Sequence, residues 1–175
     1  DVLVVFEMNG EPLPAGHGFP ARLIVPGFYG LKSVKWLTAI EPVDYDFKGY
    51  WQERGWIDVP YVKTFSRFDI PATDIVIQEG SVTLGGVAFA GDRGISKIEV
   101  SADDGLSWTP VDEISAPLSP YTWVIWTKEF VPALSGPQVV RVRATDGDGM
   151  VQTSRRKGTV PDGATGHHEL PFSFG

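Results

Sequence analysis

The sequence predicts a mainly β protein whose second part, from about residue 71, is an antiparallel β-sandwich. Its 20 glycines and 14 prolines accompany many valines, isoleucines, threonines and aromatic residues, a balance that favours strands and turns over helices. Short runs beyond residue 80 alternate apolar and polar side chains, and Asp–Gly turn signals separate these runs. Short strands at a spacing of roughly 8–12 residues are typical of a sandwich.

The composition excludes several classes of protein. With 175 residues, 42% of them hydrophobic and 21% charged, the chain can bury a core. The net charge of −7 argues against a general nucleic-acid binder, which needs a basic face. The chain has no cysteine, which excludes disulfides, zinc thiolate sites, iron–sulfur clusters and cysteine nucleophiles within it. No stretch approaches the ~20 apolar residues of a membrane span.

The first part of the chain predicts short elements between loops. Residues 2–6 and 21–26 are apolar runs expected to form buried strands, with proline- and glycine-rich loops between them. Residues 31–40 fit either a strand or a short helix, and residues 46–60 indicate an aromatic loop. The chain opens on Asp1 and runs directly into an apolar stretch, which indicates a piece of a longer protein. The pattern changes at residues 68–74, where we expect a domain boundary.

The sandwich strands are predicted by alternation with period two. Apolar residues alternate with polar ones at 81–84, 98–101 and 140–145. Turn signals stand at 103–105 and 146–149. We expect residues 161–168 to form an ordered coil outside the sandwich.

Several polar and aromatic motifs have simple structural readings. The alternating acidic residues of Asp146–Gly149 could suggest calcium, but no later glutamate follows, so a hairpin turn is favoured. His167, His168 and Glu169 lack the spacing of a metalloprotease motif and are expected to be structural, with the rim of an active site as the alternative. An aromatic set is expected to form core or a domain interface rather than an exposed binding platform; it comprises Trp51, Trp56, Tyr121, Trp123 and Trp126.

A cationic run near the start of the chain is the strongest candidate site. Arg22 and Lys35 can neutralise a phosphate, the first bidentately and the second as a point charge. His17 can hydrogen-bond a ring or a phosphate oxygen, and the glycines around it allow close approach of the backbone. The spacing alone favours a plainer interpretation, in which the glycines shape turns and Arg22 and Lys35 pair with surface carboxylates.

The same run resembles a known family. Residues 9–14, 17–22 and 33–37 are similar to the second half of the cofactor-binding domain of sulfite oxidases and assimilatory nitrate reductases. Four downstream segments resemble the family's immunoglobulin-like dimerisation domain: residues 85–89, 98–101, 104–108 and 143–146. The resemblance implies that residues 1–70 are the C-terminal part of a mixed α+β molybdopterin-binding domain. It implies that residues 71–175 are an immunoglobulin-like β-sandwich for dimerisation, with a C-terminal tail.

The resemblance also implies a function for the parent protein. Members of this family are molybdenum-cofactor oxidoreductases that couple oxygen-atom transfer to two-electron redox chemistry. The residues matching His17, Arg22 and Lys35 contact the pterin and the phosphate of the cofactor, and main chain near Ser33 contributes. The resemblance further implies a homodimer through the sandwich, and an exported or membrane-tethered parent.

The chain departs from the family pattern in three ways. The family holds molybdenum through a cysteine, which this chain lacks, so we expect the chain alone to be inactive and free of cofactor. Trp56 stands where the family carries a tyrosine of the substrate pocket, and a family arginine near the C-terminus has no match in residues 166–169. The rival hypothesis is a non-enzymatic immunoglobulin-like binding module. In that case His17, Arg22 and Lys35 would diverge in space, whereas cofactor binding requires them to converge on one concave patch.

Overall fold

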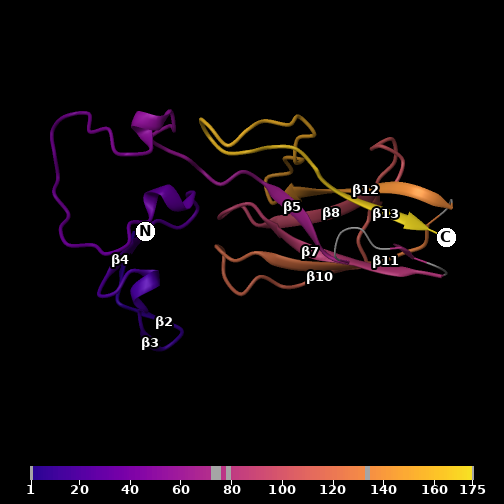
Figure 1. Cartoon of the computed structure of the whole chain (residues 1–175), viewed down its shortest axis with the longest axis horizontal. Helices are drawn as coiled ribbons and strands as arrows, with labels where there is room; N and C mark the ends of the chain where they lie inside the picture. The colour runs from indigo at the N-terminus through magenta and orange to yellow at the C-terminus, as the bar shows by residue number, and fades with distance from the viewer. Residues whose placement is uncertain (1, 72–75, 78–79, 133–134, 175) are drawn as a thin grey trace. The chain divides into compact units, whose positions relative to one another are not determined.

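The computed structural model describes residues 2–71, 76–77, 80–132 and 135–174, and these form two compact units. The first unit comprises Asp1–Val62 with Thr159–Gly163, and the second comprises Lys63–Gly158 with Ala164–Gly175 (Figure 1). The chain therefore passes from one unit to the other after Val62, and β5 (Phe65–Ile70) belongs to the second unit. Residues 72–74 of the expected boundary segment lie outside the described residues.

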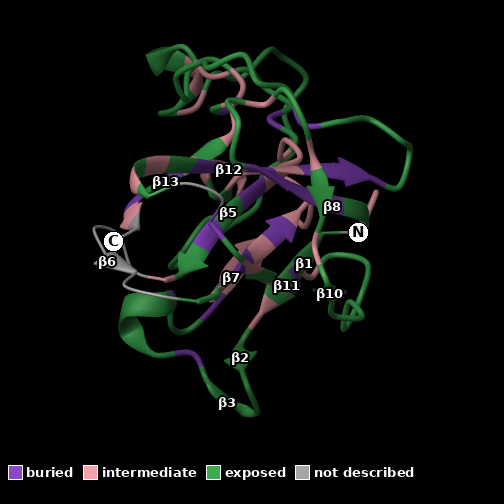
Figure 2. Ribbon diagram, turned by 90° about the vertical axis from the view of Figure 1, so that its right-hand side faces the viewer, coloured by how far each residue is buried: buried purple, intermediate pink, exposed green. Residues whose placement is uncertain are grey.

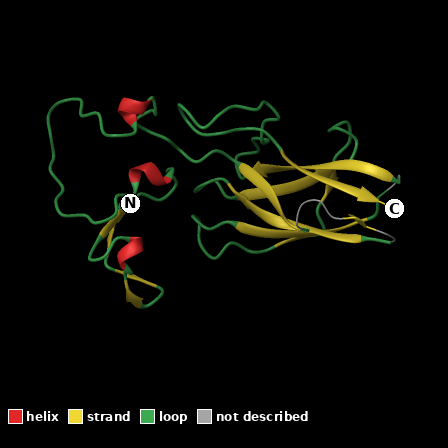
Figure 3. Ribbon diagram, viewed as in Figure 1, coloured by secondary structure: helices red, strands yellow, loops and turns green. Residues whose placement is uncertain are grey.

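The second unit is a sandwich of two sheets (Figure 3). One sheet, here the β7 sheet, has the strand order β10 (Glu113–Ile114), β11 (Val124–Phe130), β7 (Val82–Phe89) and β5. The other, here the β12 sheet, has the order β6 (Val76–Ile77), β13 (His168–Phe174), β12 (Gly136–Asp146), β8 (Ile95–Ser101) and β9 (Thr109–Pro110). All pairs are antiparallel except β6 with β13. The predicted mainly β, immunoglobulin-like fold class is confirmed.

The core of the sandwich lies between the inner faces of the two sheets (Figure 2, purple). Trp126 is fully buried, and its ring meets the ring of Phe68 at 5.4 Å between centroids. The alternation predicted at 81–84, 98–101 and 140–145 is confirmed in part. Ser81 precedes β7, and the strands of the three runs bury the apolar side chains of Leu84, Ile98, Val100, Val140, Val142 and Ala144. The polar residues Glu99, Ser101 and Thr145 are buried as well, so the polar positions do not all face outward. Burial of each large side chain stabilises the fold by roughly 1.5–3 kcal/mol.

Strand β13 was not expected from the sequence. The tail is coil up to His167, as predicted, but His168 begins a strand that pairs with β12 along its whole length. Leu170 and Phe172 point into the core, where they are almost completely buried. The tail therefore completes the β12 sheet.

The first unit contains little regular structure. Two small antiparallel sheets join β1 (Leu3–Val5) to β4 (Arg22–Ile24) and β2 (Glu7–Met8) to β3 (Glu11–Pro12). Its described helices are single 3-10 turns, namely η1 (Ala15–His17), η2 (Gly30–Lys32) and η3 (Gln52–Arg54). The prediction for residues 31–40 was wrong, because only η2 reaches into that stretch, and the rest is neither strand nor helix. The aromatic loop expected at 46–60 is present, interrupted only by η3.

The apolar runs of the first unit form strands, but the expectation that these strands are buried was wrong. Leu3 and Val4 are 48% and 44% exposed, and the residues of β4 are half-buried. Among the described residues, β1 and β4 pair only with each other, so no further strand covers them. No helix in the described part of the chain is long and apolar enough to cross a membrane.

Candidate functional site

The candidate site is built on the turn that follows Pro14. Gly18 caps the C-terminus of η1, and its φ of 114° lies in the left-handed region that glycine tolerates best. A Cβ at this position would stand 3.1 Å from the Cβ of Arg22 and 3.2 Å from the Cβ of Lys35. Gly18 therefore allows the turn to lie directly against the two cationic residues.

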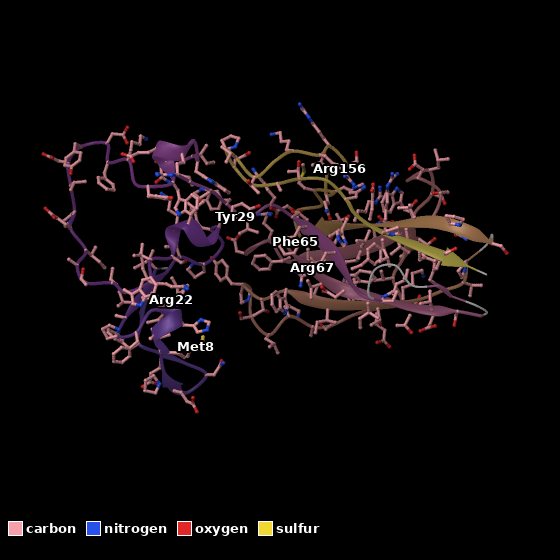
Figure 4. All side chains as sticks on the ribbon, viewed as in Figure 1. Met8, Arg22, Tyr29, Phe65, Arg67 and Arg156 are labelled. Atoms are coloured by element: carbon pink, nitrogen blue, oxygen red, sulfur yellow. The ribbon has the colours of Figure 1, made fainter. Side chains whose placement is uncertain are left out.

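Three side chains donate hydrogen bonds to consecutive carbonyl groups of this turn. Trp36 Nε1 donates to the Ala15 carbonyl at 3.0 Å, and Lys35 Nζ donates to the Gly16 carbonyl at 2.8 Å. Arg22, which Figure 4 labels, donates from Nη1 to the His17 carbonyl at 3.1 Å. The structure thus brings Arg22 and Lys35 to one turn, and His17 forms part of that turn.

Main-chain hydrogen bonds place these residues side by side. The Leu23 N–H donates to the Val34 carbonyl at 2.8 Å, and the Leu37 N–H donates to the Ala21 carbonyl at 2.9 Å. These bonds hold residues 34–37 beside β4, although 13 positions separate Arg22 from Lys35 in the sequence.

The cationic groups keep spare hydrogen-bonding capacity. Each makes one described hydrogen bond, whereas a guanidinium has five N–H donors and an ammonium has three. Arg22 Nε is buried and has no hydrogen-bond partner among the described residues. Among the described residues, neither Arg22 nor Lys35 pairs with a carboxylate. The plainer interpretation, in which both residues pair with surface carboxylates, is therefore not favoured. A buried N–H without a partner costs about 1–3 kcal/mol, so this donor set suits an anion such as a phosphate.

Ser33 takes part in the local turn. Its N–H donates to the Gly30 carbonyl at 2.9 Å, and its hydroxyl accepts the Val25 N–H at 3.3 Å. Ser33 therefore connects η2 to the end of β4, and its own N–H is used within the turn.

Trp56 lies in a separate aromatic cluster. Its main-chain N–H donates to the Trp51 carbonyl at 3.1 Å. Its ring meets the ring of Tyr29 edge-on, with centroids 5.8 Å apart. The ring of Tyr29 lies so close to Gly163 that a Cβ there would collide with it. No described contact joins Trp56 to Arg22 or Lys35. Sequence reasoning missed Tyr29 because nothing in its neighbourhood signals this contact with the 159–163 segment.

The acidic turn at residues 146–149 is present as predicted, and its carboxylate has structural partners. Asp146 accepts hydrogen bonds from Arg93 Nε at 3.0 Å, from the Thr64 hydroxyl at 3.0 Å and from the Met150 N–H at 2.9 Å. Burial alone would raise the pKa of Asp146, but these hydrogen bonds outweigh it and lower the pKa. Within the described residues, no group of three potential ligands could hold a metal ion.

The two adjacent histidines are bound into the sandwich. His167 Nε2 lies 3.0 Å from the Gln152 carbonyl, and its ring meets that of Trp108 edge-on at 5.1 Å. His168 Nδ1 accepts the Phe68 N–H at 3.0 Å. The structural interpretation of both histidines is therefore supported.

The aromatic set is divided. Trp126 is fully buried in the core, as predicted. Trp51, Tyr121 and Trp123 are instead 44%, 43% and 60% exposed. The interpretation as core thus holds for part of the set only.

Two family models match the chain. The oxidoreductase molybdopterin binding domain matches residues 1–51, and the Mo-co oxidoreductase dimerisation domain matches residues 70–160. The two matches follow the chain in the order that the resemblance implied.

Similar proteins come from several organisms. Mitochondrial sulfite oxidase of Mus musculus is 32% identical over 174 residues, covering 87% of this chain and 32% of the relative. Nitrate reductase [NADH] 2 of Phaseolus vulgaris is 28% identical, covering 83% of this chain and 20% of the relative. The crystal structure of the sulfane dehydrogenase SoxCD from Paracoccus pantotrophus superposes with a TM-score of 0.67 at 27% identity, covering 88% of this chain and 42% of that chain.

The chain spans about a third of the length of the animal sulfite oxidases it matches. The dimerisation-domain match alone covers more than half of the 175 residues, and the preceding residues match the molybdopterin-binding model. The chain therefore belongs to the sulfite oxidase family of molybdenum-cofactor oxidoreductases.

Proposed function

We propose that this chain is the C-terminal part of a molybdenum-cofactor oxidoreductase whose reaction couples oxygen-atom transfer to two-electron redox. In this proposal residues 1–70 supply part of the cofactor pocket, and residues 71–175 supply the contact of a homodimer. The observation that carries the proposal is the convergence of Arg22 and Lys35 on the turn at residues 15–18, with donors to spare. The matches to two oxidoreductase domains support it, and they do not favour the non-enzymatic alternative.

The residues at this turn fit the cofactor's phosphate side. The Arg22 guanidinium and the Lys35 ammonium would bind the phosphate, and the buried Arg22 Nε would gain the acceptor that it lacks. His17 would hydrogen-bond the pterin, and main chain near Ser33 would complete the contacts. When bound, the cofactor supplies the redox chemistry, while these residues hold and orient it.

The chain by itself would not catalyse the reaction. It contains no cysteine, and the soft thiolate ligand that the family resemblance implies must come from elsewhere in the parent. Trp56 would line the substrate pocket in place of the family's tyrosine, with Tyr29 supporting its ring. Exchange of a phenol for an indole removes an acidic hydroxyl, so the substrate can differ from sulfite.

The test is metal analysis of the natural full-length gene product. We expect about one molybdenum per chain and an upstream cysteine. Arg22→Gln and Lys35→Gln should each lower the molybdenum content at least several-fold. The control is Arg54→Gln, because Arg54 Nη1 also donates to a main-chain carbonyl, that of Tyr50, away from the turn. A full-length product without molybdenum would overturn the proposal, and equal molybdenum in Arg22→Gln and Arg54→Gln would overturn the assignment of Arg22.

A further inference from the structure

A cationic hollow, here the β5–β13 hollow, lies in the second unit. It has a volume of about 600 Å³, and its lining comes from β5, β12 and β13 and from the connection between β12 and β13. Among the described residues, three cationic side chains line it, those of Arg67, Arg156 and Lys157, against the single carboxylate of Glu169. The hollow thus has a surplus of positive charge in a chain whose net charge is −7.

The carboxylate of Glu169 is already paired through both oxygens. Oε1 accepts a hydrogen bond from Arg141 Nε at 3.0 Å, and Oε2 pairs with Arg156 Nη2 at 2.7 Å. Arg141 belongs to β12 and does not line the hollow, and it also pairs with the exposed Asp104. Glu169 therefore repels an incoming anion less than a carboxylate without partners would.

Lys157 and Arg67 keep hydrogen-bond donors for a ligand. Within the described part of the chain, the ammonium of Lys157 has neither an ion pair nor a hydrogen bond. Arg67 pairs with Asp69 through Nε at 3.0 Å, and its two Nη groups make no described hydrogen bond. An ammonium has three donors and a guanidinium has five, so both side chains can bind a further acceptor.

The main chain holds the basic run at residues 155–157 in place. Lys157 and Thr165 bond to each other through their main-chain groups, at 3.3 and 3.4 Å, and the Thr165 hydroxyl donates to the Arg155 carbonyl at 2.6 Å. Arg156 lies directly over Gly166, where a Cβ would stand only 2.9 Å from its Cγ. The cations are therefore positioned before a ligand arrives, which lowers the entropic cost of binding.

His168 adds an uncharged donor to the lining. Its Nδ1 accepts the Phe68 N–H at 3.0 Å, so the neutral ring carries its proton on Nε2. Nε2 makes no hydrogen bond to any described residue, and the ring lines the hollow. A neutral N–H beside three cations suits an oxyanion such as a carboxylate.

Part of the lining is apolar. Phe65, Val139 and Pro171 share the hollow with the cations, and Val139 and Pro171 are exposed neighbours across the pairing of β12 with β13. Figure 4 labels Phe65 and Arg67, from β5, and Arg156, from the connection that follows β12. An inorganic anion would leave the apolar surface uncovered, whereas the volume is within the roughly 300–1,000 Å³ of sites for organic ligands.

We propose that the β5–β13 hollow binds an organic anion, with its acidic group on the three cations and its apolar part against Phe65, Val139 and Pro171. Charge-assisted hydrogen bonds would select the anion, and the covered apolar area would add affinity. The site goes beyond the proposed cofactor contacts, because it uses none of the residues at the turn of residues 15–18 and lies wholly in the second unit.

The test compares two ligands of the same shape, naphthalene-2-carboxylate and the uncharged naphthalene-2-carboxamide. Each is titrated into the 175-residue chain, and binding is followed by two-dimensional amide NMR. We expect the carboxylate to shift the amides of residues 65–67, 156–157 and 164–169. It should bind about tenfold more tightly than the carboxamide, because only the carboxylate forms charge-assisted hydrogen bonds.

Single substitutions test the cations. Lys157→Gln and Arg67→Gln should each weaken carboxylate binding about three- to tenfold, and should change carboxamide binding little. Arg155→Gln is the matched control, because it removes the same charge from the same basic run, yet Arg155 does not line the hollow. All three side chains are exposed, so the variants should keep the fold, which their amide spectra show directly.

Three results would overturn the proposal. Equal affinities for the carboxylate and the carboxamide would show that the hollow does not select an anion. Equal effects of Arg155→Gln and Lys157→Gln would show only a general attraction by the basic run. Shifts confined to residues 16–18, 22 and 35 would place the carboxylate at the turn of the first unit. None of these results alters the molybdenum analysis, so this proposal and the proposed function fail separately.

Discussion

His168 accepts the main-chain N–H of Phe68 through Nδ1, at 3.0 Å, and thereby joins the two sheets of the sandwich. Phe68 belongs to β5 of the β7 sheet, and His168 begins β13 of the β12 sheet. The centroids of the Phe68 and His168 rings also lie 5.9 Å apart. Only an unprotonated Nδ1 can accept this hydrogen bond, so the contact depends on the charge state of the imidazole.

The sandwich should lose stability as the pH falls through the range of histidine titration. Desolvation lowers the pKa of His168 below its ordinary value of 6.5; Asp69 and Glu169 raise it and Arg67 lowers it, but desolvation dominates. The unfolded state keeps the ordinary pKa of 6.5, so it takes up the proton at a higher pH than the folded state does. The stabilisation is therefore complete above pH 6.5 and declines as the pH falls through 6.5 toward the lower folded-state pKa. Urea unfolding of the second unit at pH 7.5 and pH 5.0 measures this loss.

A variant with an uncharged acceptor isolates the contribution of His168. His168→Asn places an amide oxygen near the position of Nδ1. This variant should lose less stability between the two pH values than the unsubstituted chain. His17→Asn is the control, since His17 is exposed in the other unit. His167 also has a pKa lowered by burial, so part of the pH dependence should remain in His168→Asn. Identical losses of stability in His168→Asn and in the unsubstituted chain would show that the hydrogen bond to Phe68 does not cause the pH dependence.

Gln152→Ala should destabilise the sandwich by roughly 2–4 kcal/mol. The buried Gln152 Oε1 accepts the Ser66 hydroxyl at 2.7 Å and the Ala144 N–H at 3.0 Å, and Nε2 donates to the Gly166 carbonyl at 2.8 Å. Truncation leaves these partners without their hydrogen bonds. Thermal unfolding checks the prediction, and the exposed neighbour Thr153→Ala should shift the midpoint little. A loss below about 1 kcal/mol in Gln152→Ala would mean that water replaces the amide.

The strands of the sandwich were predictable because burial on one face imposes a period of two. β13 was missed although Leu170 and Phe172 alternate, because Pro171 lies between them and proline is rare inside sheets. The structure explains the exception. The described pairing of β6 with β13 involves only Ser173 and Phe174, so at Pro171 one side of β13 has no neighbouring strand among the described residues.

The candidate site depended on contacts that no local pattern encodes. Arg22 and Lys35 meet because main-chain bonds join residues 21–23 to 34–37, and composition or periodicity cannot predict such pairing. The family resemblance identified the residues, whereas the spacing alone favoured surface ion pairs. Burial of β1 and β4 was predicted wrongly for a related reason, since apolar runs predict strands but do not say what covers them.

Gly18→Ala should disturb the turn that carries the site. The substituted residue would have to keep a φ of 114°, and its Cβ would lie tighter than usual against the side chains of Arg22 and Lys35. The expected cost is about 1–3 kcal/mol in the first unit. Gly16→Ala is the control, because nothing lies within 4 Å of a Cβ at that position. Amide hydrogen exchange at residues 14–23 should rise in Gly18→Ala and stay unchanged in Gly16→Ala; equal exchange in both would contradict the argument.

The 175-residue chain should bind inorganic phosphate at the turn, because Arg22 and Lys35 keep free donors and Arg22 Nε lacks an acceptor. In a phosphate titration followed by two-dimensional amide NMR, the largest shifts should come from residues 16–18, 22 and 35. Each of Arg22→Gln and Lys35→Gln should weaken binding about tenfold, the effect of losing one charge-assisted hydrogen bond. Lys48→Gln is the control, since Lys48 already pairs with Asp46 and Asp58 in the same unit. Absent shifts would show that phosphate does not bind, and shifts that survive both substitutions would place the anion elsewhere. Either result would remove the physical support for Arg22 and Lys35 as phosphate ligands.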